Sequence, residues 1–210
     1  VARAVKTLGG KSKLLIMLPT IEGDLYKELL DLENLNVTYQ DIEGQVRHAI
    51  AMNQESPNLN TVIVGKGPDM KVGEWDKYCQ LVSDLVSPGE IVVEMGSLTP
   101  NFPSNALETL SKVVHAKDGK LLVDSSPACL KTRGSEIFDF ITPNLDEAEA
   151  LLANSSEAIY VPSDTDIEAR AIKAATGLYQ SVSKIVLVTA GSHGVAVKSD
   201  SIETWVPAFT

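Results

Sequence analysis

The segment Pro143-Asn144-Leu145-Asp146-Glu147 places an amide and two carboxylates where an apolar run meets a stretch of helix-forming residues. In one interpretation Asn144 caps a helix, and the two carboxylates lie favourably near the positive end of its dipole. In the other, Asn144 and Glu147 face a cleft together, one helical turn apart. The Glu147 carboxylate then holds water molecules on Mg²⁺, which rarely takes a full cage of protein ligands. The spacing leaves both interpretations open.

The second candidate is the glycine-containing segment Thr189-Ala190-Gly191-Ser192-His193-Gly194. It is either a plain turn between a strand and a hairpin, or a loop whose backbone approaches a nucleotide. His193 lies within it, but a histidine in a turn is more often solvated than catalytic. His48 and His115 form no cluster with it in the sequence.

Arg47 is the third candidate, and it too has two interpretations. It is a solvated strand residue, or its planar guanidinium folds over a cleft and grips a phosphate. Asp124, directly after an apolar run, either caps a turn or lies in the cleft. The chain has no Walker A, GxSxG, HExxH or Rossmann GxGxxG motif, which argues against P-loop kinases, α/β-hydrolases, zincins and dinucleotide enzymes.

Short continuous apolar runs alternate with helical patterns along the chain. Such runs are typical of strands buried on both faces, and the alternation predicts a parallel sheet covered by helices. The predicted strands are Leu14–Leu18, Ile91–Met95, Leu121–Val123, Phe138–Thr142 and Lys184–Thr189, followed by a hairpin of Val195–Lys198 and Ile202–Val206. The predicted helices are Asp24–Leu32, Val72–Val86, Ser104–Ala116, Leu145–Ala153 and Asp166–Gln180, the last with a Thr165/Glu168 capping box.

Residues 37–64 interrupt this alternation. Val37–Ile42, Val46–Met52 and Thr61–Val64 are short, rich in β-formers and separated by turn residues. They are predicted as antiparallel strands with polar faces, forming a small flap beside the main sheet.

Four predicted strands end in small or polar residues, after Met95, Val123, Thr142 and Val188. Ligands of open parallel sheets bind beyond the carboxyl ends of the strands. The four exits therefore predict a cleft for a polyanion or a sugar.

Composition limits the partners. The chain has 210 residues and a formal net charge of -10, which disfavours nucleic acid and anionic membranes but allows an anionic small molecule in a basic pocket. No signal peptide is expected, and no apolar run reaches the ~20 residues of a membrane span. Cys79 and Cys129 form no CxxC pair, so a reducing cytoplasm without a disulfide is expected.

Five segments together resemble the PfkB, or ribokinase-like, family of sugar kinases. "TPNLDEAEAL" is similar to its PN-x-x-E motif, and "VARAVKTLGGKS" to the tail of its N-terminal glycine motif. "EMGSLTPNFPS" resembles the GSLPPG-P stretch of its phosphosugar branch, "VLVTAGSHGVAV" its V-T-x-G-x-x-G turn, and "WVPAF" the strand before its catalytic loop. The order and spacing agree over nearly the whole chain.

The resemblance implies an α/β fold: a three-layer α/β/α sandwich with a mostly parallel sheet and a small antiparallel β lid. It implies one domain over residues 1–210, incomplete at both ends, with the lid strands within residues 37–64. It also implies ATP-dependent, Mg²⁺-assisted phosphorylation of a sugar hydroxyl. The lid would cover the sugar and provide a homodimer contact.

The resemblance also implies roles for individual residues. Asn144 and Glu147 would organise the phosphates and Mg²⁺, and Thr189, Gly191 and Gly194 would line the nucleotide. Arg47 lies where the phosphosugar branch has a Thr-Arg pair that grips a substrate phosphate.

No catalytic base is assigned in this chain, because the family's Asp is expected beyond Thr210 and the sugar-binding Asp before Val1. His48-Ala49-Ile50-Ala51 stands where the phosphosugar branch carries Asn and Lys. Thr142 and "SPACL" at 126–130 are closer to ribokinase. The expected substrate is a phosphosugar such as fructose 1-phosphate or tagatose 6-phosphate. The alternatives are a ribose or nucleoside kinase, and a non-catalytic sugar- or nucleotide-binding protein.

Overall fold

The chain folds into two compact units, which consist of Val1–Leu85 with Thr99–Phe102 and of Val86–Leu98 with Pro103–Thr210. The structure, a computed structural model, describes all residues except 55–58, 97–98, 100, 157–165 and 210.

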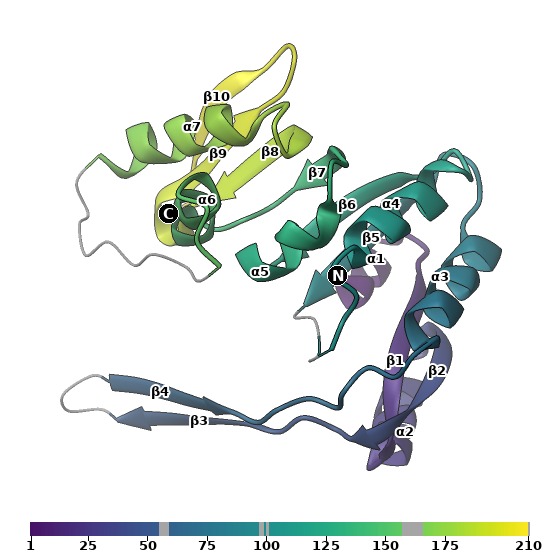
Figure 1. Cartoon of the computed structure of the whole chain (residues 1–210). Coiled ribbons are helices and arrows are strands. Elements are labelled where there is room, and N and C mark those ends of the chain that lie inside the picture. The colour runs from purple at the N-terminus through teal and green to yellow at the C-terminus, as the bar shows by residue number, and fades with distance from the viewer. Residues whose placement is uncertain (55–58, 97–98, 100, 157–165, 210) are drawn as a thin grey trace. The chain divides into compact units, whose positions relative to one another are not determined.

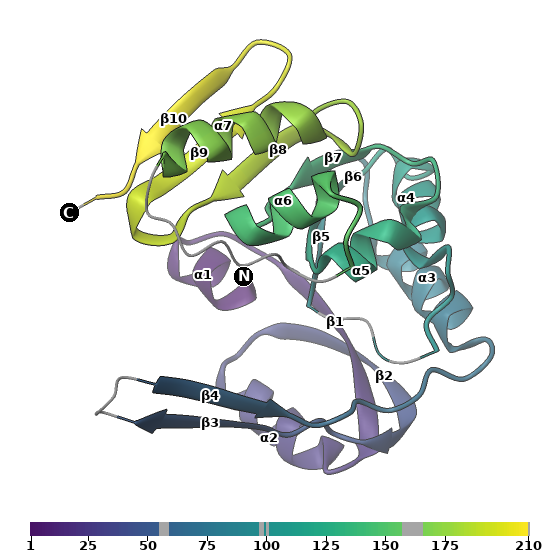
Figure 2. The same cartoon turned by 60° about the vertical axis from the view of Figure 1, so that its left-hand side comes forward.

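The second unit is built on a six-stranded sheet with the strand order β10-β9-β8-β7-β6-β5 (Figure 2). Strands β5 to β8 are parallel, and β9 and β10 form an antiparallel extension. The bounds are Ile91–Gly96 for β5, Lys120–Ser125 for β6, Phe138–Ile141 for β7, Ser183–Thr189 for β8, Gly194–Lys198 for β9 and Glu203–Pro207 for β10. All four predicted parallel strands of this unit and the predicted hairpin are confirmed.

The helices of this unit connect successive parallel strands, and every connection steps in the same direction across the sheet. Because such crossovers are right-handed, these helices lie on one face (Figures 1 and 2). They are α4 (Ala106–His115), α5 (Pro127–Leu130), α6 (Leu145–Leu152) and α7 (Ile167–Leu178), with the short 3₁₀ turn η1 (Lys131–Arg133). A second 3₁₀ turn, η2 (Gly191–His193), connects β8 to the antiparallel strand β9.

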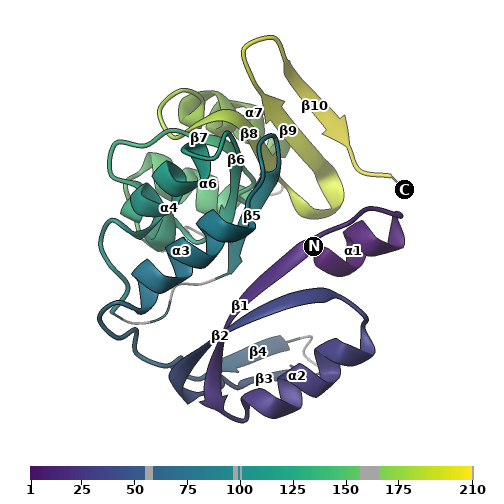
Figure 3. The same ribbon diagram turned by 90° about the vertical axis from the view of Figure 1, so that its right-hand side faces the viewer.

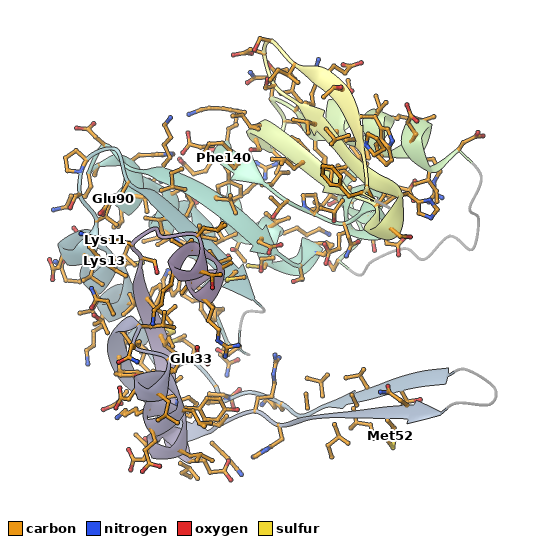
Figure 4. All side chains as sticks on the ribbon, turned by 180° about the vertical axis from the view of Figure 1, so that it is seen from behind. Lys11, Lys13, Glu33, Met52, Glu90 and Phe140 are labelled. Carbon is orange, nitrogen blue, oxygen red and sulfur yellow. The ribbon has the colours of Figure 1, made fainter. Side chains whose placement is uncertain are left out.

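The alternation of side chains in the strands separates a covered face from an open one. Val123, Ile141 and Val186 lie side by side in register and are buried. The neighbouring row of Leu122, Phe140 and Ile185 is only half-buried; Phe140 is labelled in Figure 4. Hydrophobic burial on the helical face therefore supplies most of the core of this unit.

The first unit contains a parallel strand pair, β1 (Lys13–Ile21) and β2 (Asn36–Gln45), joined by α2 (Gly23–Leu32). The prediction of an antiparallel strand at Val37–Ile42 is therefore wrong. A helix between two strands returns the chain to the same end of the sheet, which makes the pair parallel. Two further helices are α1 (Ala2–Thr7) and α3 (Glu74–Leu85), and α3 buries Trp75, Cys79 and Val82 as predicted.

The antiparallel part of residues 37–64 is one hairpin of β3 (Ala49–Gln54) and β4 (Leu59–Val64) (Figures 1 and 3). The predicted polar faces are wrong, because Ile50, Met52 and Ile63 are exposed on one face and Val62 and Val64 on the other. Met52 is labelled on this hairpin in Figure 4. The antiparallel part is therefore confined to β3 and β4, called the lid hairpin below, and exposed apolar side chains lie on both of its faces. Its role as a lid stays a prediction.

Both cysteines are buried free thiols. Throughout the described part of the chain, no helix has the length and apolarity needed to cross a membrane. The organisation of residues 1–210 as one domain stays a prediction.

Candidate active site

The four strand exits predicted to form a cleft belong to four adjacent parallel strands, β5 to β8. Their carboxyl ends therefore share one edge of the sheet, as the prediction requires. Within the β5 exit, Ser97, Leu98 and Pro100 fall outside the described residues.

The exits of β7 and β8 are held together by the backbone. Asn144 lies opposite Thr189 in an isolated parallel bridge, and the Thr189 N–H donates to the Pro143 carbonyl oxygen at 3.0 Å. Two segments that are 45 positions apart in the sequence, both predicted as site residues, thus lie side by side.

Asn144 and Glu147 form a complete capping box at the start of α6. The Glu147 N–H donates to Asn144 Oδ1 at 2.9 Å, and the Asn144 N–H donates to Glu147 Oε2 at 2.9 Å. The local interpretation as a helix cap is confirmed. The metal role of Glu147 is a separate property of the same carboxylate and stays a prediction.

Glu149, two residues further on, is not a solvent-facing helix carboxylate. Arg170 on α7 donates to it from Nε at 2.8 Å and from Nη2 at 2.7 Å. The two side chains are only 21% and 24% exposed. This bidentate ion pair connects α6, whose first turn holds Asn144 and Glu147, to α7.

The turn after β8 depends on its two glycines for different reasons. Gly191 has φ +56, and no atom lies within 4 Å of the position a Cβ would take. Gly194 has φ +141, and a Cβ there would lie 2.3 Å from the Val206 carbonyl oxygen. The Ala190 N–H donates to the Gly194 carbonyl oxygen at 2.9 Å and closes the turn. His193 is exposed, as expected.

Glu94 is a residue of this edge that the sequence analysis missed. It lies on the covered face of β5, beside Val123, and its Oε2 atom is buried without a hydrogen-bond partner in the described part of the chain. Burial, and then the charge of Asp124, raise the pKa of Glu94 to about 7. The sequence did contain a sign of this residue, because Glu94 is the one carboxylate inside the apolar run Ile91–Met95.

Cys129, on α5, shares this environment. Burial, and then the charge of Glu94, raise the pKa of its thiol to about 12, against the effect of a hydrogen bond with Ser125. Since the thiolate is the reactive form, Cys129 is an inert core residue at neutral pH. The Ser125 hydroxyl donates to the Gly96 carbonyl oxygen and ties the end of β5 to β6.

Arg47 belongs to the other unit, in the segment between β2 and β3, and is exposed. It is not among the residues that the sheet brings together, and its phosphate-binding role stays a prediction. Among the described residues, no three His, Cys, Asp or Glu side chains cluster closely enough to hold a metal ion by themselves.

A scan against family models matches residues 1–210, the whole chain, to the description "pfkB family carbohydrate kinase". The chain belongs to the PfkB family of carbohydrate kinases. The sequence-based resemblance is thereby confirmed.

Individual relatives agree with this assignment. The 1-phosphofructokinase of Bacillus subtilis (strain 168) is 25% identical over 148 residues, which are 70% of this chain and 47% of that protein. The tetrameric inhibited form of phosphofructokinase-2 from Escherichia coli superposes with a TM-score of 0.81 at 22% identity, covering 98% of this chain and 65% of that one. The same enzyme in complex with fructose-6-phosphate gives a TM-score of 0.77.

The structural similarity confirms the α/β fold class with a mostly parallel sheet and a small antiparallel sheet. The chain spans about half the length of the Bacillus relative and just under two thirds of the Escherichia coli chain.

Proposed function

We propose that the protein is an ATP-dependent kinase that transfers the γ-phosphate of ATP to a hydroxyl of a phosphosugar such as fructose 1-phosphate or tagatose 6-phosphate. The observation that carries this proposal is the family match over all 210 residues. The adjacent exits of β5 to β8 support it, because they provide a ligand edge in the second unit.

The nucleotide is assigned to the exits of β7 and β8. Asn144, Thr189, Gly191 and Gly194 would line it. The open space beside Gly191 supports this role, since a side chain there would stand between the backbone and a ligand. The capping box fixes the first turn of α6, so Asn144 and Glu147 need little reordering when a ligand binds.

Glu147 is the residue that would hold Mg²⁺. Its carboxylate lies in the first turn of α6 beside Asn144, and Mg²⁺ keeps most of its waters and uses one or two carboxylates together with substrate phosphates. When bound, Mg²⁺ would neutralise charge on the phosphates. No residue of this chain is assigned as the general base.

Arg47 would grip the phosphate of the sugar, because its guanidinium suits the geometry of a phosphate and is exposed beside the lid hairpin. The lid hairpin 49–64 would cover the sugar and contribute to a homodimer. We assign the protein to the cytoplasm, in keeping with two unpaired thiols.

A second candidate substrate is ribose or a nucleoside. It is favoured by Thr142 before Pro143 and by the uncharged Ala49-Ile50-Ala51 after His48. The test is turnover of the full-length protein in a coupled assay with fructose 1-phosphate, fructose 6-phosphate, tagatose 6-phosphate and ribose. We expect the phosphosugars to be turned over, and turnover of ribose alone would reject the phosphosugar assignment.

Glu147→Gln tests the metal role. Glutamine can still accept the Asn144 N–H, so the capping box persists and the melting temperature should change by less than about 2 °C. Turnover should fall at least about 100-fold, because the carboxylate charge is lost. Asp146→Asn, a charge change in the same helical turn, is the matched control and should keep most of the activity. Glu147→Gln activity equal to wild type across a Mg²⁺ titration would contradict the role.

Arg47→Ala tests the phosphate grip. We expect the KM for the phosphosugar to rise at least about tenfold, as for the loss of a charge-assisted hydrogen bond, while the KM for ATP stays the same. Arg3→Ala, which removes an exposed arginine on α1 of the same unit, is the control. An unchanged phosphosugar KM would show that Arg47 binds no phosphate.

A further inference from the structure

Three residues, Val46-Arg47-His48, connect β2 to the lid hairpin and include the arginine to which the phosphate is assigned (Figure 1). This link belongs to neither strand, so the position of Arg47 depends on the contacts of its two neighbours. The link and its contacts lie wholly within the first unit.

The backbone of the link is hydrogen-bonded on both sides of Arg47. The Val46 N–H donates to the Ile21 carbonyl oxygen, at the end of β1, at 3.3 Å. The Gly65 N–H, directly after β4, donates to the His48 carbonyl oxygen at 2.8 Å. A Cβ added to Gly65 would lie 3.2 Å from that oxygen and 4.0 Å from Arg47 Cγ, so the chain after β4 passes close to the link.

A side-chain contact adds to these backbone bonds. His48 Nε2 lies 2.7 Å from Glu22 Oε2, which is the distance of a hydrogen bond to a charged acceptor. The two side chains are 63% and 41% exposed, so the contact contributes little to global stability. It does connect the link to the turn between β1 and α2.

Glu22 has an unusual backbone conformation for a glutamate. Its φ is +69, in the left-handed region, at the residue that precedes α2. Glycine takes this conformation without strain. The Glu22 side chain also makes no capping hydrogen bond with α2. Neither the turn nor the helix therefore explains a glutamate here, whereas the contact with His48 does.

We propose that Glu22 is a positioning residue for the sugar phosphate: through His48 it fixes the link, and it thereby holds Arg47 in the position from which the guanidinium binds the phosphate. The inference rests on the proposed function, because it takes Arg47 as the phosphate ligand. A binding residue that is already in place loses less conformational freedom when the ligand arrives, so a fixed link increases affinity without a further contact to the sugar.

Glu22→Gly in the full-length protein tests this role. Glycine suits the left-handed turn, so the melting temperature should stay within about 2 °C of wild type or rise. The KM for the phosphosugar should rise at least about fivefold, as for one lost hydrogen bond, while kcat and the KM for ATP stay within about twofold. Glu22→Gln, whose amide oxygen can still accept from His48, should stay near wild type.

Double-mutant cycles show whether the effect passes through His48 and Arg47. His48→Ala should raise the phosphosugar KM as Glu22→Gly does, and the two together should be no worse than either alone, because both remove one contact. In an Arg47→Ala protein, Glu22→Gly should change this KM by less than about twofold. Asp69→Ala removes an exposed carboxylate that pairs with Lys66 in the same unit, and this matched control should change nothing.

An unchanged phosphosugar KM in Glu22→Gly, where Arg47→Ala raises it, would overturn this inference and leave the proposed function intact. An equal increase with and without Arg47 would overturn it as well, because Glu22 would then act by another route. If Arg47→Ala itself leaves the phosphosugar KM unchanged, the phosphate role of Arg47 fails, and the inference with it. Absence of turnover with every sugar phosphate would reject both the proposed function and the inference.

Discussion

At the scale of single residues, Glu94 on β5 is unusual because it has a buried carboxylate oxygen without a hydrogen-bond partner among the described residues. Its pKa, raised from 4.5 to about 7 by burial and by Asp124, means that the folded state binds a proton more tightly than the unfolded state does. The contribution of Glu94 to the free energy of unfolding is therefore fully present below pH 4.5, and it is lost as the pH rises from there through about 7. The lost stability amounts to about 3 kcal/mol at most.

Glu94→Gln should remove this dependence. At pH 8 the free energy of unfolding of the variant should exceed that of wild type by about 1–3 kcal/mol, and at pH 5 the two should be nearly equal. Urea unfolding at both pH values measures this. Glu28→Gln, at an exposed glutamate of α2, is the matched control. A Glu94→Gln variant that is less stable than wild type at pH 8 would show that the ionised carboxylate has a partner.

Residue types at the site could be predicted where the contact is local. The Asn144/Glu147 pair is a capping box because the two residues are three positions apart, and this spacing is visible in the sequence. The partner of Glu149 was not visible, since Arg170 lies 21 positions away on another helix. The Glu149 carboxylate and the Arg170 guanidinium come into contact only when α6 packs against α7.

At the scale of elements, the turn between β8 and β9 has the tightest backbone packing at the site. A methyl group at Gly194 would meet the Val206 carbonyl oxygen at 2.3 Å, which is backbone and cannot rotate away. The φ of +141 adds strain for any side chain. Replacing this glycine must therefore displace β10 or open the turn.

Gly194→Ala should cost about 2–4 kcal/mol of stability and raise the KM for ATP at least about tenfold, because the turn is assigned to the nucleotide. Thermal unfolding and the coupled assay measure the two effects. Gly89→Ala is the matched control: its φ of +80 is also left-handed, but no atom lies within 4 Å of the new methyl group. It should cost only about 1 kcal/mol and leave the KM unchanged. Equal effects of the two substitutions would contradict the close approach at Gly194.

Elements with a strong local pattern were predictable, and their partners were less so. The apolar runs of β5 to β8 indicated buried parallel strands, and the alternation with helices determined their direction. Strand β2 was assigned to the lid because Val37–Ile42 resembles its neighbours in composition, whereas its pairing with β1 is set by the intervening helix α2. His115 seemed isolated in the sequence, yet its Nε2 lies 2.8 Å from Asp139 Oδ2, and Lys184 donates to the other oxygen at 2.9 Å. These contacts tie α4 to β7 and β8, and only the folded sheet brings them together.

At the scale of the whole molecule, the lid hairpin leaves apolar side chains uncovered on both faces. A two-stranded hairpin alone is marginally stable in water, and exposed apolar faces usually mark contact surfaces. Ile50, Met52 and Ile63 form one face, and Val62 and Val64 lie beside alanines on the other. The two roles proposed for the lid, covering the sugar and forming a homodimer, require two such faces.

The face with the three larger side chains buries more apolar area on association, so we assign it to the homodimer. Ile63→Glu should weaken the dimer at least about 100-fold, because the dimer would bury an unpaired carboxylate. Val62→Glu places the same charge one residue away, on the opposite face, and is the matched control. It should leave the dimer intact and raise the KM for the phosphosugar instead. Sedimentation equilibrium of the full-length protein gives the dimer constant, and a dimer that survives Ile63→Glu but not Val62→Glu would reverse the assignment of the two faces.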